Sequence, residues 1–272
     1  MLRCHSERVV IASLMMYERP ELNDAHERLW SLVHRQLDHR GIASPDQLDQ
    51  NAEEFSVWTN PDLVLSQTCG MPYRTCLHGK VQLVGTPDYD LEGCQPGYYR
   101  SALVVRYDEP KTRLVEFAQS IFAFNKPYSQ SGYAAAYWHA DAEKFWFRKK
   151  YYTGAHRQSA LAVADGRADI AALDAVTWRF IQQYGDIAGQ LRVLDWTVPT
   201  PGLPLITSLN HNRLLIRDAV SAALDKLSIS DRSLLGIKGL VPIESEDYMA
   251  VANPELEECR FQPNGETDIH ST

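Results

Sequence analysis

The segment Ser129-Gln130-Ser131-Gly132 carries the residue types best suited to binding an anion. It follows the short apolar run 121–124, which predicts a strand, and it precedes an alanine-rich stretch, which predicts a helix. Backbone N–H groups in the first turn of a helix have no partner inside the helix, and the helix dipole adds partial positive charge there. The serine hydroxyls add donors, and the glycine lets a ligand approach the backbone. The segment therefore predicts an anion site without a metal, although either serine could instead be only the N-cap of the helix.

His156 and Asp174 supply two further polar groups at expected helix starts. His156 could be a surface histidine at a helix start. Asp174 follows the apolar run 169–173 and precedes a helical pattern. Its carboxylate could accept a hydrogen bond from a hydroxyl, an amine or a protonated acid oxygen of a ligand, or it could only cap the helix. Both roles of Asp174 can hold at once.

A second polar stretch, Gln67-Thr68-Cys69, follows the apolar run 62–66, which predicts another strand. In open α/β sheets, ligands bind beyond the carboxyl ends of the strands, so this stretch is a candidate pocket wall. Cys69 is equally well explained as a small buried hydrophobic residue. Tyr17 follows an expected strand and Tyr99 precedes another, and both are candidates for this part of the pocket. Tyr17 could also be a core aromatic.

Composition restricts the class of protein. The chain has 272 residues and 44% hydrophobic residues, which is ordinary for a soluble globular protein. Its net charge of −8 argues against a nucleic-acid partner. Five dispersed cysteines predict reduced thiols, and no metal-ligand spacing occurs, so neither a metal nor a cofactor is expected. No apolar run reaches the ~18 residues of a membrane-spanning helix. The run 9–16 predicts a strand and not a signal peptide, which places the chain as it stands in the cytoplasm, or in the periplasm if the true start lies upstream.

Apolar strand-like runs alternate with helical patterns, which predicts an α/β protein with largely parallel sheets. Two places predict crossings between lobes: the polar stretch near 104–111 and the proline-rich stretch near 195–203. If both are crossings, residues 1–106 and 198–272 form a discontinuous first lobe, and residues 107–197 form the second. The chain is expected to be a monomer.

Several segments occur along most of the chain in a family-typical order: 15–24 (MMYERPELND), 65–74 (LSQTCGMPYR), 85–89 (GTPDY), 96–101 (PGYYRS), 124–135 (FNKPYSQSGYAA), 153–160 (TGAHRQSA), 168–178 (ADIAALDAVTW) and 199–204 (PTPGLP). In these segments the chain resembles the type 2 periplasmic-binding-protein superfamily. Within it, the chain is similar to the phosphate/phosphonate substrate-binding branch of ABC importers. The resemblance implies two α/β lobes that close by a hinge over a ligand in an interlobe cleft.

The resemblance also implies roles for particular residues. Ser129, Gln130 and Ser131 match a serine-rich anion loop, in which Gln130 stands where the family often has a small hydroxyl residue. His156 matches a histidine that donates to the oxyanion, and Tyr17 matches a pocket-wall tyrosine. The implied function is a solute-binding protein that captures a small oxyanion-bearing ligand, such as phosphate or a phosphonate, for an ABC-type importer with a permease partner.

Three other functions are compatible with parts of the sequence. Cys69, His156 and Asp174 could form a thiol–imidazole–carboxylate set, which would make the chain an enzyme. The chain has no G-x-S-x-G elbow and no phosphate-binding G-x-x-x-x-G-K-[ST] loop, so we expect no enzyme. The same superfamily plan would serve a binder of a pyrimidine or thiamine precursor, or a cytosolic ligand sensor.

Overall fold

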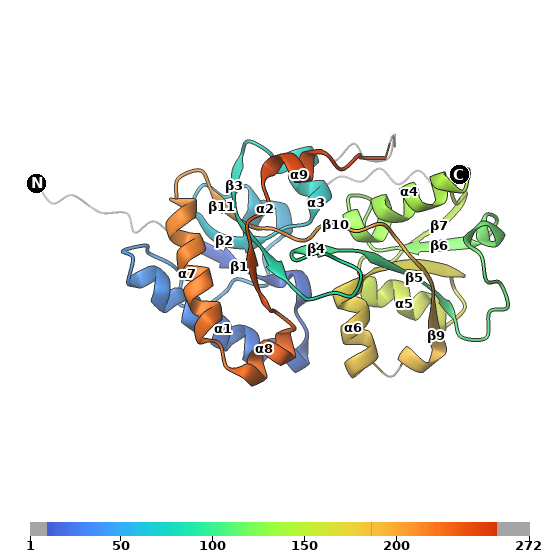
Figure 1. The fold of residues 1–272 in the computed structure, drawn as a ribbon, viewed down its shortest axis with the longest axis horizontal. Helices are drawn as coiled ribbons and strands as arrows, with labels where there is room; N and C mark the ends of the chain where they lie inside the picture. The colour runs from blue at the N-terminus through green and yellow to red at the C-terminus, as the bar shows by residue number, and fades with distance from the viewer. Residues whose placement is uncertain (1–9, 186, 255–272) are drawn as a thin grey trace, which may run out of the picture. The chain divides into compact units, whose positions relative to one another are not determined.

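The computed structural model describes residues 10–185 and 187–254, which divide into two compact units (Figure 1). Unit 1 contains the described residues up to Arg100 and the segment Pro199–Val251, and unit 2 contains Ser101–Val198 and the described residues from Ala252. The expected boundary after residue 106 therefore differs from this division, because strand 101–106 pairs with strands of unit 2. The described residues after Val251, which are 252–254 and were expected in the first lobe, group with unit 2.

Unit 1 is built on a five-stranded mixed sheet. Its strand order is β1-β2-β11-β3-β12. The strands are β1 (Ile11–Ser13), β2 (Leu63–Gln67), β11 (Leu205–Ser208), β3 (Val81–Asp88) and β12 (Gly239–Val241). Strands β1 and β2 are parallel, but β11 runs antiparallel to both β2 and β3, and β12 is antiparallel to β3. The expectation of largely parallel sheets is wrong here, because β11 and β12 return from the second crossing in the opposite direction.

Helices cover this sheet, and two of them lie side by side (Figure 1). α1 (Asn23–Asp38) buries Ala25, Leu29, Val33 and Leu37, which recur at helical spacing, and it contacts α7. The other helices of unit 1 are α2 (Glu54–Trp58), α3 (Gly70–Pro72) with the π-helical turn η3 (Tyr73–Leu77), α7 (Arg213–Lys226), α8 (Ile229–Leu235) and α9 (Ser245–Met249).

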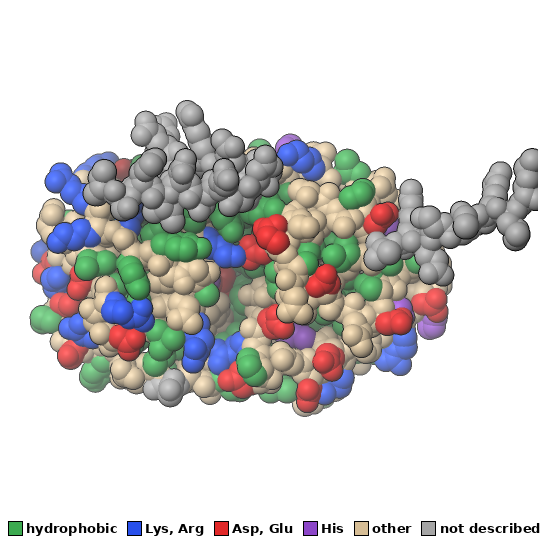
Figure 2. Space-filling view, turned by 180° about the vertical axis from the view of Figure 1, so that it is seen from behind, with side chains coloured by type: hydrophobic (Ala, Val, Ile, Leu, Met, Phe, Trp, Pro, Cys, Tyr) green, Lys and Arg blue, Asp and Glu red, His purple; other side chains and the backbone are tan. Residues whose placement is uncertain are grey.

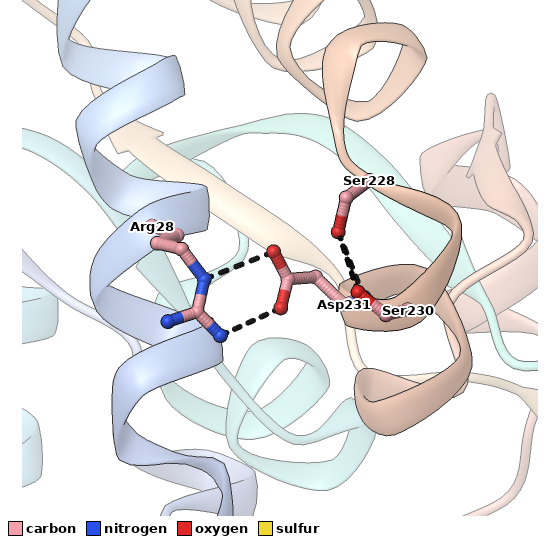
Figure 3. Close-up of polar contacts among 4 residues, drawn as sticks. All are labelled: Arg28, Ser228, Ser230 and Asp231. Atoms are coloured by element: carbon pink, nitrogen blue, oxygen red, sulfur yellow. Dashed lines mark hydrogen bonds and ion pairs between the residues drawn. The ribbon is translucent and has the colours of Figure 1, made fainter.

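An ion pair joins α1 to α8 (Figure 3). The Arg28 guanidinium donates from Nε and from one terminal nitrogen to the two carboxylate oxygens of Asp231, at 3.0 and 2.7 Å. The side chain of Ser228, the N-cap of α8, accepts from the Asp231 backbone N–H at 3.0 Å. Arg28 holds the pKa of the Asp231 carboxyl below its ordinary value. The two-point geometry fixes the start of α8 against α1.

Unit 2 has its own five-stranded mixed sheet. Its strand order is β7-β6-β8-β5-β9, and its helices are α4, α5 and α6. The elements are β5 (Ser101–Arg106), β6 (Ile121–Phe124), α4 (Ala135–Ala142), β7 (Lys149–Tyr152), α5 (His156–Ala164), β8 (Ile170–Asp174), α6 (Ala175–Tyr184) and β9 (Leu191–Trp196). Strands β6, β7 and β8 are parallel, and β5 runs antiparallel to β8 and β9.

Helices lie on both faces of this sheet (Figure 1), and alternate residues of β5 belong to two different hydrophobic clusters. Ala102 and Val104 of β5 face the cluster that contains residues of α5 and α6. Leu103 and Val105 face the cluster that contains residues of α4. Since side chains of a strand alternate between faces, the odd-numbered residues of β5, including Ser101, belong to the α4 face.

The crossings between the units at Arg100/Ser101 and at Val198/Pro199 lie in chain segments that pair with each other. On the unit 1 side, β4 (Tyr98–Tyr99) pairs antiparallel with β10 (Thr200–Pro201). On the unit 2 side, the N–H of Thr197 donates to the carbonyl of Ser101 at 3.0 Å. The second crossing, between Val198 and Pro199, lies inside the region 195–203 expected for it. The first crossing, between Arg100 and Ser101, lies just before the expected region 104–111.

Cys69, Cys76 and Cys94 are free thiols, and Cys4 and Cys259 lie outside the described residues. Within residues 10–185 and 187–254, no helix is long and apolar enough to cross a membrane, and no group of three potential ligands could hold a metal ion. On the face drawn in Figure 2, acidic and basic side chains are interspersed.

Candidate functional site

The predicted serine loop lies between β6 and α4. Ser129 is the N-cap of a π-helical turn, η5 (Gln130–Ala134), which leads directly into α4. The Ser129 Oγ accepts a hydrogen bond from the N–H of Gly132 at 3.0 Å. This bond confirms the N-cap role of Ser129. It uses a lone pair of the hydroxyl, so the hydroxyl proton can still be donated to a ligand.

Ser131 and His156 meet across two helix starts. The Ser131 Oγ and the His156 Nε2 are 3.0 Å apart, and His156 is the first residue of α5. The loop is buried: Ser131 is 4% exposed. The other ring nitrogen of His156 is shielded from solvent. Burial lowers the pKa of His156 to about 4, against the opposing effect of the Ala172 carbonyl. The imidazole is therefore neutral at physiological pH.

Packing within the chain leaves no room for a side chain at Gly132. A Cβ at position 132 would lie 1.9 Å from the Oδ1 of Asn125 and 3.1 Å from the Cε1 of His156. Asn125 is only 9% exposed, and within the described part of the chain its Oδ1 has no hydrogen-bond partner. The side of Gly132 on which a Cβ would stand is thus covered by Asn125 and His156, and its role toward a ligand stays a prediction.

Asp174 ends β8 and begins α6. Its Oδ1 accepts from the N–H groups of Val176 and Thr177 at 2.8 and 3.1 Å, which confirms its role as an N-cap. Asp174 lies opposite Ser101 of β5 in the sheet register. Ser101 in turn donates from Oγ to the carbonyl oxygen of Ser131 at 2.8 Å. Asp174 therefore lies on β8, beside the β5 residue Ser101, which holds the serine loop. A role of Asp174 toward a ligand stays a prediction.

These contacts bring part of the predicted set together within unit 2. One hydrogen-bonded and packed group lies where β6 ends and α5 begins, and it consists of Ser129, Ser131, Gly132 and His156. Gln130 is buried in the same turn, and its role toward a ligand also stays a prediction.

The candidates of unit 1 lie where β2 ends. The Gln67 side chain donates from Nε2 to the Leu203 carbonyl at 3.1 Å, and the Thr68 N–H donates to the Pro204 carbonyl at 3.0 Å. The Thr68 hydroxyl is buried without a hydrogen-bond partner among residues 10–185 and 187–254. Cys69 is the N-cap residue of α3.

Aromatic candidates of unit 1 form two contacts. The Tyr99 hydroxyl lies 3.9 Å from the Cys69 Sγ, so the structure brings these two candidates together. Tyr17 is buried and packs edge-on against Tyr89, with ring centroids 5.1 Å apart. This packing supports the core interpretation of Tyr17, and a role as a pocket wall stays a prediction.

Arg74 is a charged residue near these candidates that the sequence did not single out. It lies in η3 and is 7% exposed. Burial lowers the pKa of its guanidinium, and the charged forms of Cys69 and Tyr99 act in the opposite direction. Its place in the quoted segment 65–74 was available from the sequence, but burial of an arginine cannot be seen there.

Two members of the enzyme-like set, His156 and Asp174, have other described hydrogen-bond partners. The described hydrogen bond of His156 Nε2 is with Ser131, and Asp174 Oδ1 binds the N–H groups of α6. Cys69 belongs to unit 1, whereas His156 and Asp174 belong to unit 2.

Comparisons with known proteins support the resemblance. The family model of ABC-transporter periplasmic substrate-binding proteins for phosphonate matches residues 69–248, and no curated protein matches the chain. PhnD1 from Prochlorococcus marinus (MIT 9301), solved in complex with methylphosphonate, is 14% identical, with a TM-score of 0.66, and the match covers 88% of this chain and 94% of that one. XAC2383 from Xanthomonas citri, bound to chloride ion, is 13% identical, with a TM-score of 0.64 and coverage of 88% and 92%.

A binding protein component of an ABC phosphonate transporter, PA3383 from Pseudomonas aeruginosa, is 14% identical, with a TM-score of 0.62 and coverage of 88% and 82%. These solved structures confirm the expected two-lobed α/β fold of type 2 periplasmic binding proteins. The family match confirms the expected role of a solute-binding protein and spans well over half of the chain. The chain belongs to the periplasmic substrate-binding proteins of phosphonate ABC transporters.

Proposed function

We propose that this protein binds a small tetrahedral oxyanion, a phosphonate or phosphate, through Ser129, Ser131 and His156. The observation that carries the proposal is the 3.0 Å contact between Ser131 Oγ and His156 Nε2 in a buried loop at the start of a helix. Both groups can turn a proton toward a ligand oxygen, and the helix start adds favourable electrostatic potential.

The charges of this group suit a reversible binder. Because His156 is neutral at physiological pH, the empty loop holds no buried cation from this residue. The donors toward an anion are then hydroxyls, a ring N–H and backbone amides. Each hydrogen bond to a charged ligand oxygen contributes about 1.5–3 kcal/mol. Three such bonds sum to about 4.5–9 kcal/mol, which corresponds to a Kd between about 0.5 mM and somewhat below 1 μM before the entropy of association is subtracted.

The same group is poorly suited to catalysis. A serine next to a histidine resembles a nucleophile with its base, but a base with a pKa of about 4 withdraws a proton weakly at neutral pH. The group that favours protonation of this ring is the Ala172 carbonyl, not a carboxylate. The family is one of transporter binding proteins and not of enzymes, which supports binding without turnover.

The partners follow from the same reasoning. Family membership supports an ABC permease as the partner and the periplasm as the place of action. A monomer accords with a binding protein that delivers one ligand at a time.

Calorimetry with a panel of ligands tests the proposal. Methylphosphonate, phosphate, sulfate and methanesulfonate are titrated into wild type, Ser131→Ala and Ser120→Ala. Ser120 is a matched control, since it is a buried serine at the other end of β6, and its hydroxyl contacts Lys111 instead of the loop. Ser131→Ala should weaken binding about ten-fold or more, and Ser120→Ala should not. Failure of every oxyanion to bind wild type, or tight binding of a neutral pyrimidine instead, would refute the proposal.

A further inference from the structure

Ser101 was not among the expected site residues, yet it contacts the serine loop directly. It is the first residue of unit 2 and of β5, and it is 1% exposed. Its Oγ donates to the carbonyl oxygen of Ser131 at 2.8 Å. The alternation of β5 places Ser101 on the α4 face, where the loop lies.

The Ser131–Gly132 peptide group is held at both ends by serine side chains. Its carbonyl accepts from Ser101 Oγ at 2.8 Å, and its N–H donates to Ser129 Oγ at 3.0 Å. A peptide group is planar, so two bonds on opposite edges fix its rotation. That rotation sets the direction of the Ser131 side chain toward His156.

The backbone of Ser101 is tied to the second crossing. The N–H of Ser101 donates to Thr197 Oγ1 at 2.9 Å, and the N–H of Thr197 donates to the carbonyl of Ser101 at 3.0 Å. Thr197 is 3% exposed and lies directly after β9. One residue therefore links the two chain segments that enter and leave unit 2 to the loop proposed to hold the anion.

We infer that Ser101 is a positioning residue that fixes the serine loop for the anion and couples that loop to Thr197 at the second crossing. The inference rests on the proposed function, because the loop is taken to hold the ligand. Removal of the Ser101 hydroxyl leaves a buried carbonyl short of one partner and frees the 131–132 peptide to rotate. The affinity for the anion should fall, because the loop must then be ordered by the ligand itself.

Three variants and one control separate positioning from general stability. Ser101→Ala removes the hydroxyl, Ser101→Thr keeps it, and Thr197→Val removes the oxygen that accepts from the Ser101 N–H. The control is Ser159→Ala, since Ser159 is equally buried in unit 2 but binds Thr153 Oγ1 and the Ala155 carbonyl. Each variant is measured for methylphosphonate affinity, for the midpoint of thermal unfolding and for amide hydrogen exchange without ligand.

Ser101→Ala should weaken methylphosphonate binding about ten-fold and speed exchange of amides 131–136 and of Thr197, with a midpoint no lower than that of the control. Ser101→Thr should retain the affinity and slow exchange of wild type. Thr197→Val should speed exchange at Ser101 and in the loop, and it decides the matter if Ser101→Ala does not fold. Unchanged loop exchange in Ser101→Ala, or in Thr197→Val where Ser101→Ala does not fold, would overturn the inference. If wild type does not bind methylphosphonate, the proposed function fails, while exchange in the ligand-free protein still decides the role of Ser101.

Discussion

Replacing Gly132 by alanine should destabilise unit 2 through one identifiable clash. The added Cβ would lie 1.9 Å from Asn125 Oδ1 and 2.8 Å from Asn125 Cγ, which is far inside contact distance. Asn125 is 9% exposed, so its side chain has little room to withdraw. Overpacking of this kind costs about 1–3 kcal/mol of unfolding free energy. Alanine's greater helix propensity offsets at most about 1 kcal/mol of this.

A second substitution makes the reasoning testable. Asn125→Ala removes the clashing amide, and its Oδ1 makes no hydrogen bond to the described residues, so its loss alone should change stability little. The pair Asn125→Ala/Gly132→Ala should then recover most of the stability that Gly132→Ala loses. The remaining neighbour, His156 Cε1 at 3.1 Å, needs to move by only a few tenths of an ångström.

Urea unfolding of wild type, both single variants and the pair gives the coupling free energy, expected at about 1–3 kcal/mol. Gly189→Ala is the control, since a Cβ there meets no atom within 4 Å. Additive effects of the two substitutions, or a Gly132→Ala variant as stable as Gly189→Ala, would show that the packing of Asn125 on Gly132 is not as described.

Three further outcomes are expected. The unfolding free energy of wild type should fall by up to about 1.4 kcal/mol per pH unit as pH drops from 6.5 toward 4, because His156 takes up a proton in the unfolded chain but not in the folded protein. Urea unfolding should show that the unfolding free energy of His156→Gln depends less on pH, and equal slopes in the two proteins would contradict the lowered pKa of His156. Asp231→Asn should lower the midpoint of thermal unfolding more than Asp225→Asn at pH 7. This difference should shrink as pH falls through the lowered pKa of Asp231, and a difference that stays constant with pH would count against the ion pair with Arg28. Small-angle scattering should show a smaller radius of gyration with methylphosphonate, and mass spectrometry should recover the ligand unchanged; a product that Cys69→Ala or His156→Ala abolishes would indicate an enzyme.

Local chemistry made several elements predictable from sequence. Ser129 and Asp174 stand where a side-chain oxygen can accept from helix N–H groups two or three residues later, and both do so. Leu29, Val33 and Leu37 recur at the spacing of one helix face, and all three are buried in α1. These features depend on residues close in sequence, so pattern and propensity suffice to find them.

Contacts between distant segments were not predictable in this way. No local pattern shows that Ser101 donates to Ser131, or that Asn125 packs on Gly132 and so requires a glycine there. No local pattern shows that β5 pairs with β8 and β9. Because of this pairing, β5 belongs to unit 2, and the first boundary between the units lies after Arg100 and not six residues later. Burial of Arg74 likewise depends on the folded surroundings.

The environment of His156 decides between two uses of one geometry. A serine hydroxyl 3.0 Å from an imidazole can belong to a nucleophile or to an anion loop. Burial makes the neutral ring the stable form, which removes the driving force for withdrawing the serine proton and avoids a buried cation in the empty loop. An incoming anion would favour a proton on the same ring, so its charge is compensated only when it is present. A loop of neutral donors held by Ser101 and Ser129 therefore combines a stable empty state with a response to negative charge.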